Sequence, residues 1–389
     1  VFLQKAGFTL HTGSDKEKAY LETFLIDNEE DIFVKQYGPK TTTPANTSLF
    51  HSWDTMILPR GEGLASDVGC ALQPVWEMIG LYEMPAIKDA EGKPIRFNSV
   101  DELWNTDEME ARCRANFFFP GMTESVSGVS IDIRGGVYKE YPGLASDGES
   151  EIPGSINDYT DTYRVRAASP GETQVINGQS VQVSGKHGLA EGTGDEGYSR
   201  TGAFIRKYVN YNADASSRVL HGSSQSWKVF RYGEILLNWA EAAYELGLIK
   251  NDNNLKREAF DHINEIRDRA GAHRHDMVES PQDIGSEIYG FPIDENLQYI
   301  RDERARELCY ENHRIFDLRR WRVADIMFQN GMYTHTLLPY YVMDENKWIF
   351  LNEVEREGRK VTFEKRWYYE QIPSSEIGKN PNLIRNDGY

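Results

Sequence analysis

The chain has 389 residues, of which 39% are hydrophobic and 27% are charged, so it can bury a substantial core. Its formal net charge of −18 opposes binding to phosphate backbones and to anionic membrane surfaces, so we expect no nucleic-acid partner. No apolar run approaches the ~20 residues needed to span a bilayer. The 21 Tyr and 8 Trp indicate either a large aromatic core or an aromatic binding face.

The three cysteines, Cys70, Cys113 and Cys309, contain no CxxC spacing, which excludes the common zinc and redox motifs. Cys309 follows Leu308 in a helical run, so we expect it to be a small buried hydrophobe. A bridge between Cys70 and Cys113 stays open at this point.

The first segment, residues 15–37, predicts a helix, a turn at Asp27-Asn28 and a short apolar strand over 32–34. The chain begins at Val1 without a Met, a basic n-region or a lipidation cysteine. We therefore expect it to be the carboxyl-terminal part of a longer precursor.

Residues 38–200 predict a loop-rich, partly β region. A long Pro-, Thr-, Ser- and Gly-rich loop over 38–70 surrounds Trp53, and a helix is expected near 72–83. Asn177-Gly178 lies between two short apolar runs, which is a hairpin signal because both residues accept positive φ. Alternation at Val129, Ile131 and Ile133 suggests a further strand, and polar stretches cover 143–158 and 185–200.

Two helices follow, over 226–246 and 255–270, closed by Gly247 and Gly271 as left-handed caps. The pair matches an irregular tetratricopeptide repeat, although an ordinary helical hairpin has the same period.

Asp294 is a plausible N-cap for a charged helix that we expect to run on to Trp321. Opposite charges three and four residues apart, such as Glu303 with Arg306 and Glu307 with Arg304, favour a structural ion-pair network over a catalytic cluster. Phe316, Leu318 and Trp321 are expected in the core.

The last residues, 370–389, have neither a helical nor a strand period but are rich in turn-forming Pro, Asn, Asp and Gly. Their apolar residues predict a tail laid over a finished domain and pinned at intervals, at Ile372, Ile377, Leu383 and Tyr389.

The tail 370–389 and the run His313-Arg314-Ile315-Phe316-Asp317-Leu318-Arg319-Arg320-Trp321 resemble the signatures of the SusD/RagB family, and the helices over 226–271 are similar to its repeats. The resemblance implies a mainly α fold: an irregular tetratricopeptide-like helical repeat body with a large loop-rich insertion containing small β-hairpins. It implies one domain, 1–389, that lacks its amino-terminal part. Residues 38–200 would be its variable region, and 201–389 its helical body and signature tail.

The function that the resemblance implies is non-catalytic capture of an oligosaccharide or polysaccharide at the bacterial surface. The ligand would pass to a SusC-like TonB-dependent transporter, and the protein would be held at the outer membrane by a lipid anchor that this chain does not contain. No catalytic residue and no cofactor is expected.

Sugar rings dock on flat aromatic side chains, and polar neighbours set specificity. The candidate binding residues follow from this: aromatic Trp227, Trp53, Trp104, Tyr82 and Trp76, and polar Asp54, Gln225 and Asn105. Trp76 and Tyr82 also fit the buried face of a helix.

Catalytic and metal motifs are missing: there is no GxSxG, P-loop, HExxH or dinucleotide fingerprint. The run 273–276, His-Arg-His-Asp, follows a helix cap in polar sequence, which favours a solvated loop over a metal site. Three alternatives stay open: capture of peptides, a protein-binding helical-repeat scaffold, and a glycosidase whose paired carboxylates sequence spacing cannot reveal.

Overall fold

The structure is a computed structural model that describes residues 6–38, 49–143, 163–165, 167–188, 190, 197–211, 215–329, 331–355 and 358–389. Nearly all of the polar stretch 143–158, and part of 185–200, lies outside these residues. The described helices are α2 Lys16–Leu25, α3 Trp53–Ile57, α4 Trp76–Ile79, α5 Ala111–Asn116, α6 Tyr232–Lys250, α7 Asn253–Ala270, α8 Gly285–Tyr289, α9 Glu295–Glu307, α10 Arg314–Arg320, α11 Ala324–Met327 and α12 Ser374–Lys379. The described strands are β1 Asp31–Lys35, β2 Phe117–Phe118, β3 Gly136–Tyr138, β4 Arg164–Val165, β5 Thr173–Ile176, β6 Gln179–Gln182, β7 Phe204–Ile205, β8 Trp227–Arg231, β9 Met332–Tyr333, β10 His335–Val342, β11 Lys347–Val354 and β12 Lys360–Val361.

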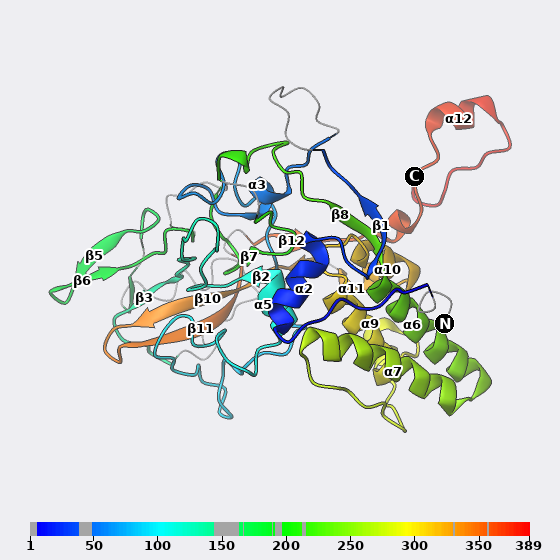
Figure 1. The fold of residues 1–389 in the computed structure, drawn as a ribbon, viewed down its shortest axis with the longest axis horizontal. Helices are drawn as coiled ribbons and strands as arrows, with labels where there is room; N and C mark the ends of the chain where they lie inside the picture. Colours follow the sequence, from blue (N-terminus) through cyan, green and yellow to red (C-terminus); the bar gives the residue numbers. More distant parts are fainter. Residues whose placement is uncertain are drawn as a thin grey trace.

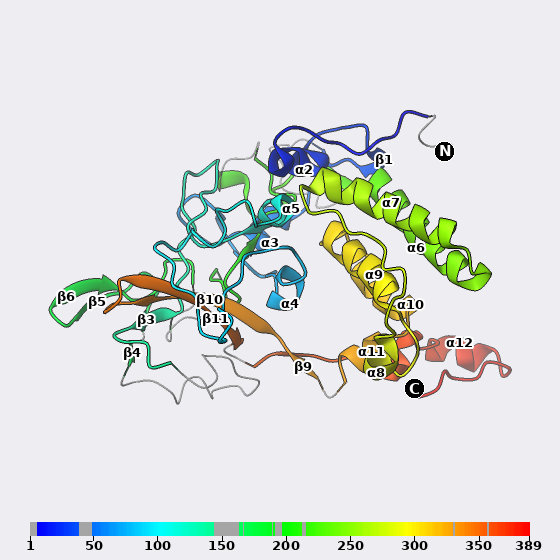
Figure 2. The same ribbon diagram turned by 90° about the horizontal axis from the view of Figure 1, so that it is seen from below.

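Helices and sheet occupy opposite ends of the molecule. The antiparallel pair α6–α7 packs on α9, while the sheet β11-β10-β3-β4 and the loops form the other end (Figure 2). The helical core between α6, α7 and α9 contains Leu237, Tyr244, Ile263 and Ile300. The antiparallel hairpin β10–β11 lies within residues 201–389 and adds two strands to the segment expected to be the helical body.

The long helix of the pair differs from its prediction at both ends. Residues 227–231 form β8, and the helix begins only at Tyr232 because β8 pairs with β1. It also continues through Gly247 to a left-handed cap at Asn251, with φ 52°. Gly247 is instead a point of close approach, since a Cβ there would lie 2.7 Å from Lys256 Cγ. The caps predicted at Gly271 and Asp294 are confirmed.

The predicted helix from Asp294 to Trp321 is broken. α9 ends at Glu307 and α10 begins at Arg314, with left-handed φ of 61° at Tyr310 and 67° at Asn312 between them. Leu318 and Trp321 are buried as expected, but the core position predicted for Phe316 is wrong. Its side chain is 59% exposed, because the left-handed residues between α9 and α10 interrupt the continuous helical period on which the prediction depended.

The regular elements of the loop-rich region are short, and only some lie where the sequence predicts them. The hairpin β5–β6 is confirmed, with Asn177 and Gly178 at φ 52° and 80° in its turn. The helix expected over 72–83 is reduced to the short α4, and residues 129–133 form a single isolated bridge instead of a strand. Irregular loops therefore connect short helices and strands in this region.

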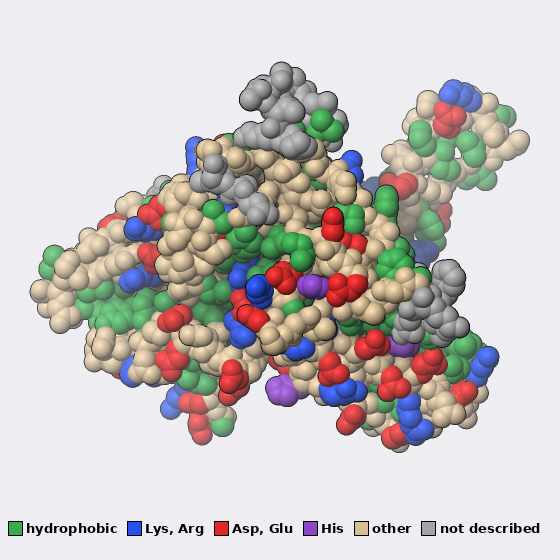
Figure 3. Space-filling model, in the orientation of Figure 1, with side chains coloured by type: hydrophobic (Ala, Val, Ile, Leu, Met, Phe, Trp, Pro, Cys, Tyr) green, Lys and Arg blue, Asp and Glu red, His purple; other side chains and the backbone are tan. Residues whose placement is uncertain are grey.

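The tail does not lie over the domain, so that prediction is wrong. Residues 369–389 form an arm that projects from the helical end, visible in red in Figure 1, and Figure 3 shows apolar side chains on its surface. α12 has no buried residue. The arm closes on itself: Asn386 Nδ2 donates to the Glu370 carbonyl at 2.7 Å, and the Tyr389 hydroxyl donates to the Tyr369 carbonyl at 3.2 Å. The four expected anchors are only half-buried.

A buried ion-pair network links β8, α5 and α7 to α9, as the structural interpretation of the charged helix predicted. Arg231 donates to Glu30 at 2.5 Å, to Glu307 at 2.7 Å and to Glu311 at 2.7 Å, and all four side chains are buried. Arg304, expected to pair with Glu307, pairs with Asp317 instead. The further members are Arg112, Lys207, Arg267, Arg269, Arg306, Glu110 and Glu303.

The three cysteines are free and buried, so Cys70 and Cys113 are not bridged. Cys309 is a core residue, as expected.

Candidate functional site

Trp53 and Trp227, which are 174 positions apart in the sequence, meet at the surface where α3 lies beside β8 (Figure 1). Their ring centroids are 5.3 Å apart at an interplanar angle of 76°. Trp227 also stacks on the buried Tyr208 at 4.0 Å and 9°. One face of Trp227 is therefore held by the core, and both indoles stay partly exposed.

A pocket of about 380 Å³ opens over this pair. Its lining side chains are Tyr37, His51, Ser52, Trp53, Met56 and Trp227. Sequence reasoning missed Tyr37, His51 and Met56. His51 lies two residues before Trp53 and Met56 lies three residues after it, so closeness in sequence to a loop Trp could have indicated both as lining residues. No sequence pattern indicated that Tyr37 lines the pocket.

Hydrogen bonds lock His51 in one tautomer. Its Nε2 donates to the Gln225 carbonyl at 2.8 Å, and its Nδ1 accepts from the Trp53 backbone N–H at 3.2 Å. Burial lowers the pKa of His51 against the raising effects of the Gln225 carbonyl and of Asp54. The imidazole ring is therefore neutral at pH 7, and its Nδ1 holds the main chain of Trp53 in place.

Two of the three polar candidates, Asp54 and Gln225, support the pocket from behind. Asp54 is buried and accepts from the Asn210 backbone N–H at 2.5 Å. Gln225 is buried and donates to the Phe24 carbonyl at 3.0 Å. Asn105 is exposed and does not line the pocket. None of the three is placed to contact a ligand in this pocket.

Three aromatic candidates belong to a different part of the molecule. Trp104 is 2% exposed and stacks on Phe119 at 4.3 Å, and Tyr82 is 4% exposed and donates to the Arg306 carbonyl at 2.7 Å. Trp76 packs against the same core. Because Trp104 and Tyr82 have no free ring face, the structure corrects their proposed role as ligand platforms.

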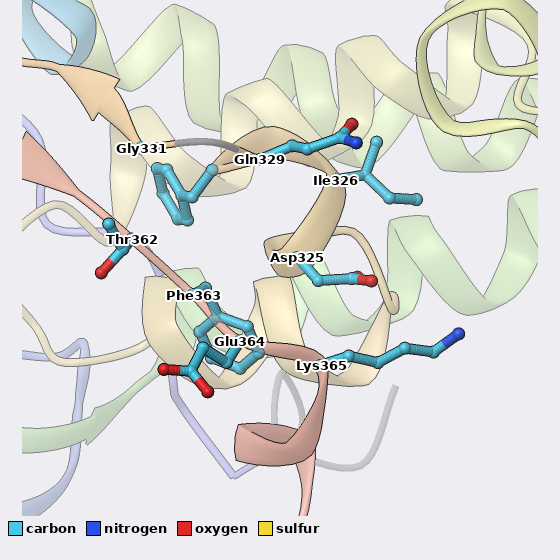
Figure 4. A pocket seen from close by; sticks show the side chains of 9 residues that line it. Asp325, Ile326, Gln329, Gly331, Thr362, Phe363, Glu364 and Lys365 are labelled. Atoms are coloured by element: carbon cyan, nitrogen blue, oxygen red, sulfur yellow. The ribbon is translucent and has the colours of Figure 1, made fainter. Parts of the chain in front are cut away.

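A second hollow, of about 530 Å³, lies between α11 and residues 362–365 (Figure 4). Its charged side chains do not converge: Glu364 points away from Asp325 and Lys365. Asp325 is also engaged by the Tyr368 hydroxyl at 2.5 Å. This arrangement offers no common ligand position.

No group of three or more His, Cys, Asp and Glu side chains in the described part of the chain could hold a metal ion. In the 273–276 loop, His273 contacts Glu83 at 2.9 Å, and His275 stacks on Tyr299 at 3.6 Å. Among the described residues, no helix is both long and apolar enough to cross a membrane.

Comparisons with known proteins agree on one family. SusD-like protein P25 of Formosa agariphila is 26% identical over a match that covers 45% of this chain and 33% of that protein. SusD-like protein P2 of the same organism is 29% identical over 48% of this chain and 30% of its own length. The chain thus spans about a third of the curated relatives that it matches.

Solved structures share the fold. A SusD-like protein from Bacteroides fragilis NCTC 9343 aligns over 99% of this chain and 60% of its own, with a TM-score of 0.54 and 21% identity. A SusD-like carbohydrate binding protein from the same organism aligns over 98% of this chain and 59% of its own, with a TM-score of 0.50 and 17% identity. The SusD family model matches residues 29–389, and the chain therefore belongs to the SusD family.

Proposed function

We propose that this protein captures a glycan at the bacterial cell surface without cleaving it. A sugar ring would bind in the pocket lined by Tyr37, His51, Ser52, Trp53, Met56 and Trp227, which we call the tryptophan pocket. The observation that carries the proposal is the pair of partly exposed indoles that line one hollow. Apolar C–H faces of a sugar pack on such rings, while polar groups at the rim bind its hydroxyls.

The pocket is built to be rigid before a ligand arrives. Tyr208 holds Trp227, His51 holds the Trp53 main chain, and the Trp53 indole N–H donates to the Lys207 carbonyl at 2.9 Å. Side chains that are already ordered lose little entropy on binding, which favours affinity. The solved B. fragilis relative described as a carbohydrate binding protein supports a glycan as the ligand.

Delivery to a SusC-like TonB-dependent transporter, with attachment to the outer membrane by a lipid anchor, completes the proposal. Its support is family membership. Copurification of such a transporter with the tagged full-length protein from its own outer membranes is the expected result. Full-length protein that purifies without any transporter would remove delivery and leave capture standing.

The test of capture is a binding screen of the full-length protein against polysaccharides and peptides, with product analysis on the same samples. We expect saturable binding to a glycan and no new reducing ends. Tyr37→Ala should weaken that binding by about fivefold, since an aromatic contact at such a site contributes ~1 kcal/mol or more. Tyr333→Ala is the matched control, because Tyr333 does not line the pocket.

Other outcomes have defined meanings. Binding to peptides alone would replace the glycan with a peptide ligand. New reducing ends would make the protein a glycosidase. Glycan binding that Tyr37→Ala leaves unchanged would place the site outside the tryptophan pocket.

A further inference from the structure

None of the described side chains that line the tryptophan pocket is acidic, although the chain carries 61 Asp and Glu against 43 Lys and Arg. Asp54, next in sequence to Trp53, is 1% exposed and turned into the protein, where its Oδ1 accepts from the Asn210 N–H. A ligand in the pocket therefore meets no exposed carboxylate from the lining residues. This local absence contrasts with the formal net charge of −18 of the whole chain.

The exposed Lys35 lies at the rim of the tryptophan pocket. Lys35 is the cross-strand partner of Trp227 in the antiparallel pair β1–β8, so the two side chains leave the same face of the pair. Its ammonium lies 5.3 Å from the centroid of the Tyr37 ring, which lines the pocket. The strand register and the ring contact thus place a positive charge at the rim independently of each other.

Lys35 differs from the other cations near the pocket because it has no carboxylate partner among the described residues. Lys228, on β8, pairs with Asp31 at 2.6 Å and with Asp27 at 3.6 Å. Lys207, beneath Trp53, pairs with Glu311 at 2.8 Å. Lys35 is exposed and forms no such pair. Its charge remains available to a ligand.

The side-chain hydrogen-bonding groups that remain at the pocket can each donate; Ser52 Oγ, for example, accepts from the His221 N–H at 2.9 Å and keeps its own O–H. His51 uses both ring nitrogens internally, and the Trp53 indole N–H is bonded to Lys207. The Trp227 indole N–H and the Tyr37 hydroxyl have no partner in the part of the chain that the structure describes, and both can donate. With the Lys35 ammonium, they suit an acceptor-rich, negatively charged group.

We propose that the tryptophan pocket binds an acidic sugar, with its ring on the indoles and its anionic substituent, a carboxylate or a sulfate, on Lys35. The inference rests on the proposed glycan capture and deepens it to a substrate class. An anionic glycan meets overall repulsion from a protein of net charge −18. An unpaired cation at the rim is what allows such a ligand to be held locally.

The experiment compares matched ligands on the full-length protein. One pair is an oligogalacturonide and the same oligosaccharide after reduction of its carboxylates; the other is a sulfated oligosaccharide and its desulfated form. We expect one charged member to bind at least about tenfold tighter than its neutral counterpart, as hydrogen bonds to charged groups are worth ~1.5–3 kcal/mol. The pair that shows the difference identifies carboxylate or sulfate.

Lys35→Gln should remove that preference, and Lys35→Arg should restore most of it. Lys360→Gln is the matched control, because the Lys360 ammonium also lies over a tyrosine ring, Tyr333, at 4.3 Å but outside the pocket. An exposed lysine is not needed for folding, so thermal melts of all three variants should match the parent.

Equal binding of charged and neutral members, binding of neutral glycans only, or a preference that survives Lys35→Gln would each overturn the acidic-sugar proposal while glycan capture stands. Failure to bind any glycan would instead refute the capture function itself.

Discussion

Glu307→Gln should destabilise the protein strongly, because Glu307 is the centre of the buried ion-pair network. Its side chain is fully buried, and it accepts from Arg231 at 2.7 Å, from Arg112 at 2.7 Å and from Arg269. The amide keeps the shape but removes the negative charge, and it turns an N–H donor toward guanidinium donors. Three cations then remain without their shared partner.

The expected loss is about 3–5 kcal/mol in the free energy of unfolding, the usual cost of breaking a buried ion pair by removing one member. With an unfolding entropy of ~2 cal/mol/K per residue, this corresponds to a fall in Tm of about 4–6 °C for a chain of this length. Urea denaturation followed by intrinsic fluorescence measures the first quantity, and calorimetry measures the second.

The pH dependence of the loss gives a second check. Burial alone would raise the pKa of Glu307, but Arg269, Arg231 and Arg112 lower it from 4.5 to about 2. A lowered carboxyl pKa adds stability above the unfolded-state value, and that stability is lost as pH falls through the folded-state value. The gap between parent and Glu307→Gln should therefore narrow between about pH 4.5 and pH 2.

Glu345→Gln is the control, since Glu345 forms an exposed pair with Arg96 at 2.6 Å. Such a pair is worth about 0–1 kcal/mol. A loss below about 1 kcal/mol for Glu307→Gln, or equal losses for the two variants, would refute the reasoning that the buried network stabilises the fold.

Three further outcomes follow from burial and charge. Phe316→Ala should change the unfolding free energy by less than about 0.5 kcal/mol, whereas Leu318→Ala should cost about 2–4 kcal/mol in the same urea titration; equal losses would place Phe316 in the core. Deletion of residues 370–389 should lower stability by less than about 1 kcal/mol, because α12 buries nothing, and a large fall in Tm would show that the arm packs on the body in solution. Burial raises the pKa of Glu353 to about 7 against the lowering effect of Arg164, so stability should decrease as pH rises from about 4.5 to about 7. Glu353→Gln should flatten this decrease, and an unchanged pH profile would contradict the assignment.

Local signals in the sequence placed several elements correctly. Asp294 caps α9 with its own side chain, Gly271 ends α7 at positive φ, and Asn177-Gly178 turns the hairpin β5–β6. Each of these features depends on a few adjacent residues, whose backbone preferences act before any tertiary contact forms. The family signatures likewise lie in continuous stretches of the chain, so membership could be read without coordinates.

The pocket, in contrast, depends on pairs that are distant in the sequence. The sequence predicts Trp227 near the start of a helix, but residues 227–231 pair with β1 and form a strand instead. The register of this pairing also places Lys35 opposite Trp227. Trp104 and Trp53 both follow polar loop sequence, yet only packing decides that Trp104 is covered by Phe119 while Trp53 stays at the surface. The sequence alone therefore determined the family and the local elements. Tertiary packing decided which aromatic side chains are exposed together, because burial depends on what the rest of the chain places over them.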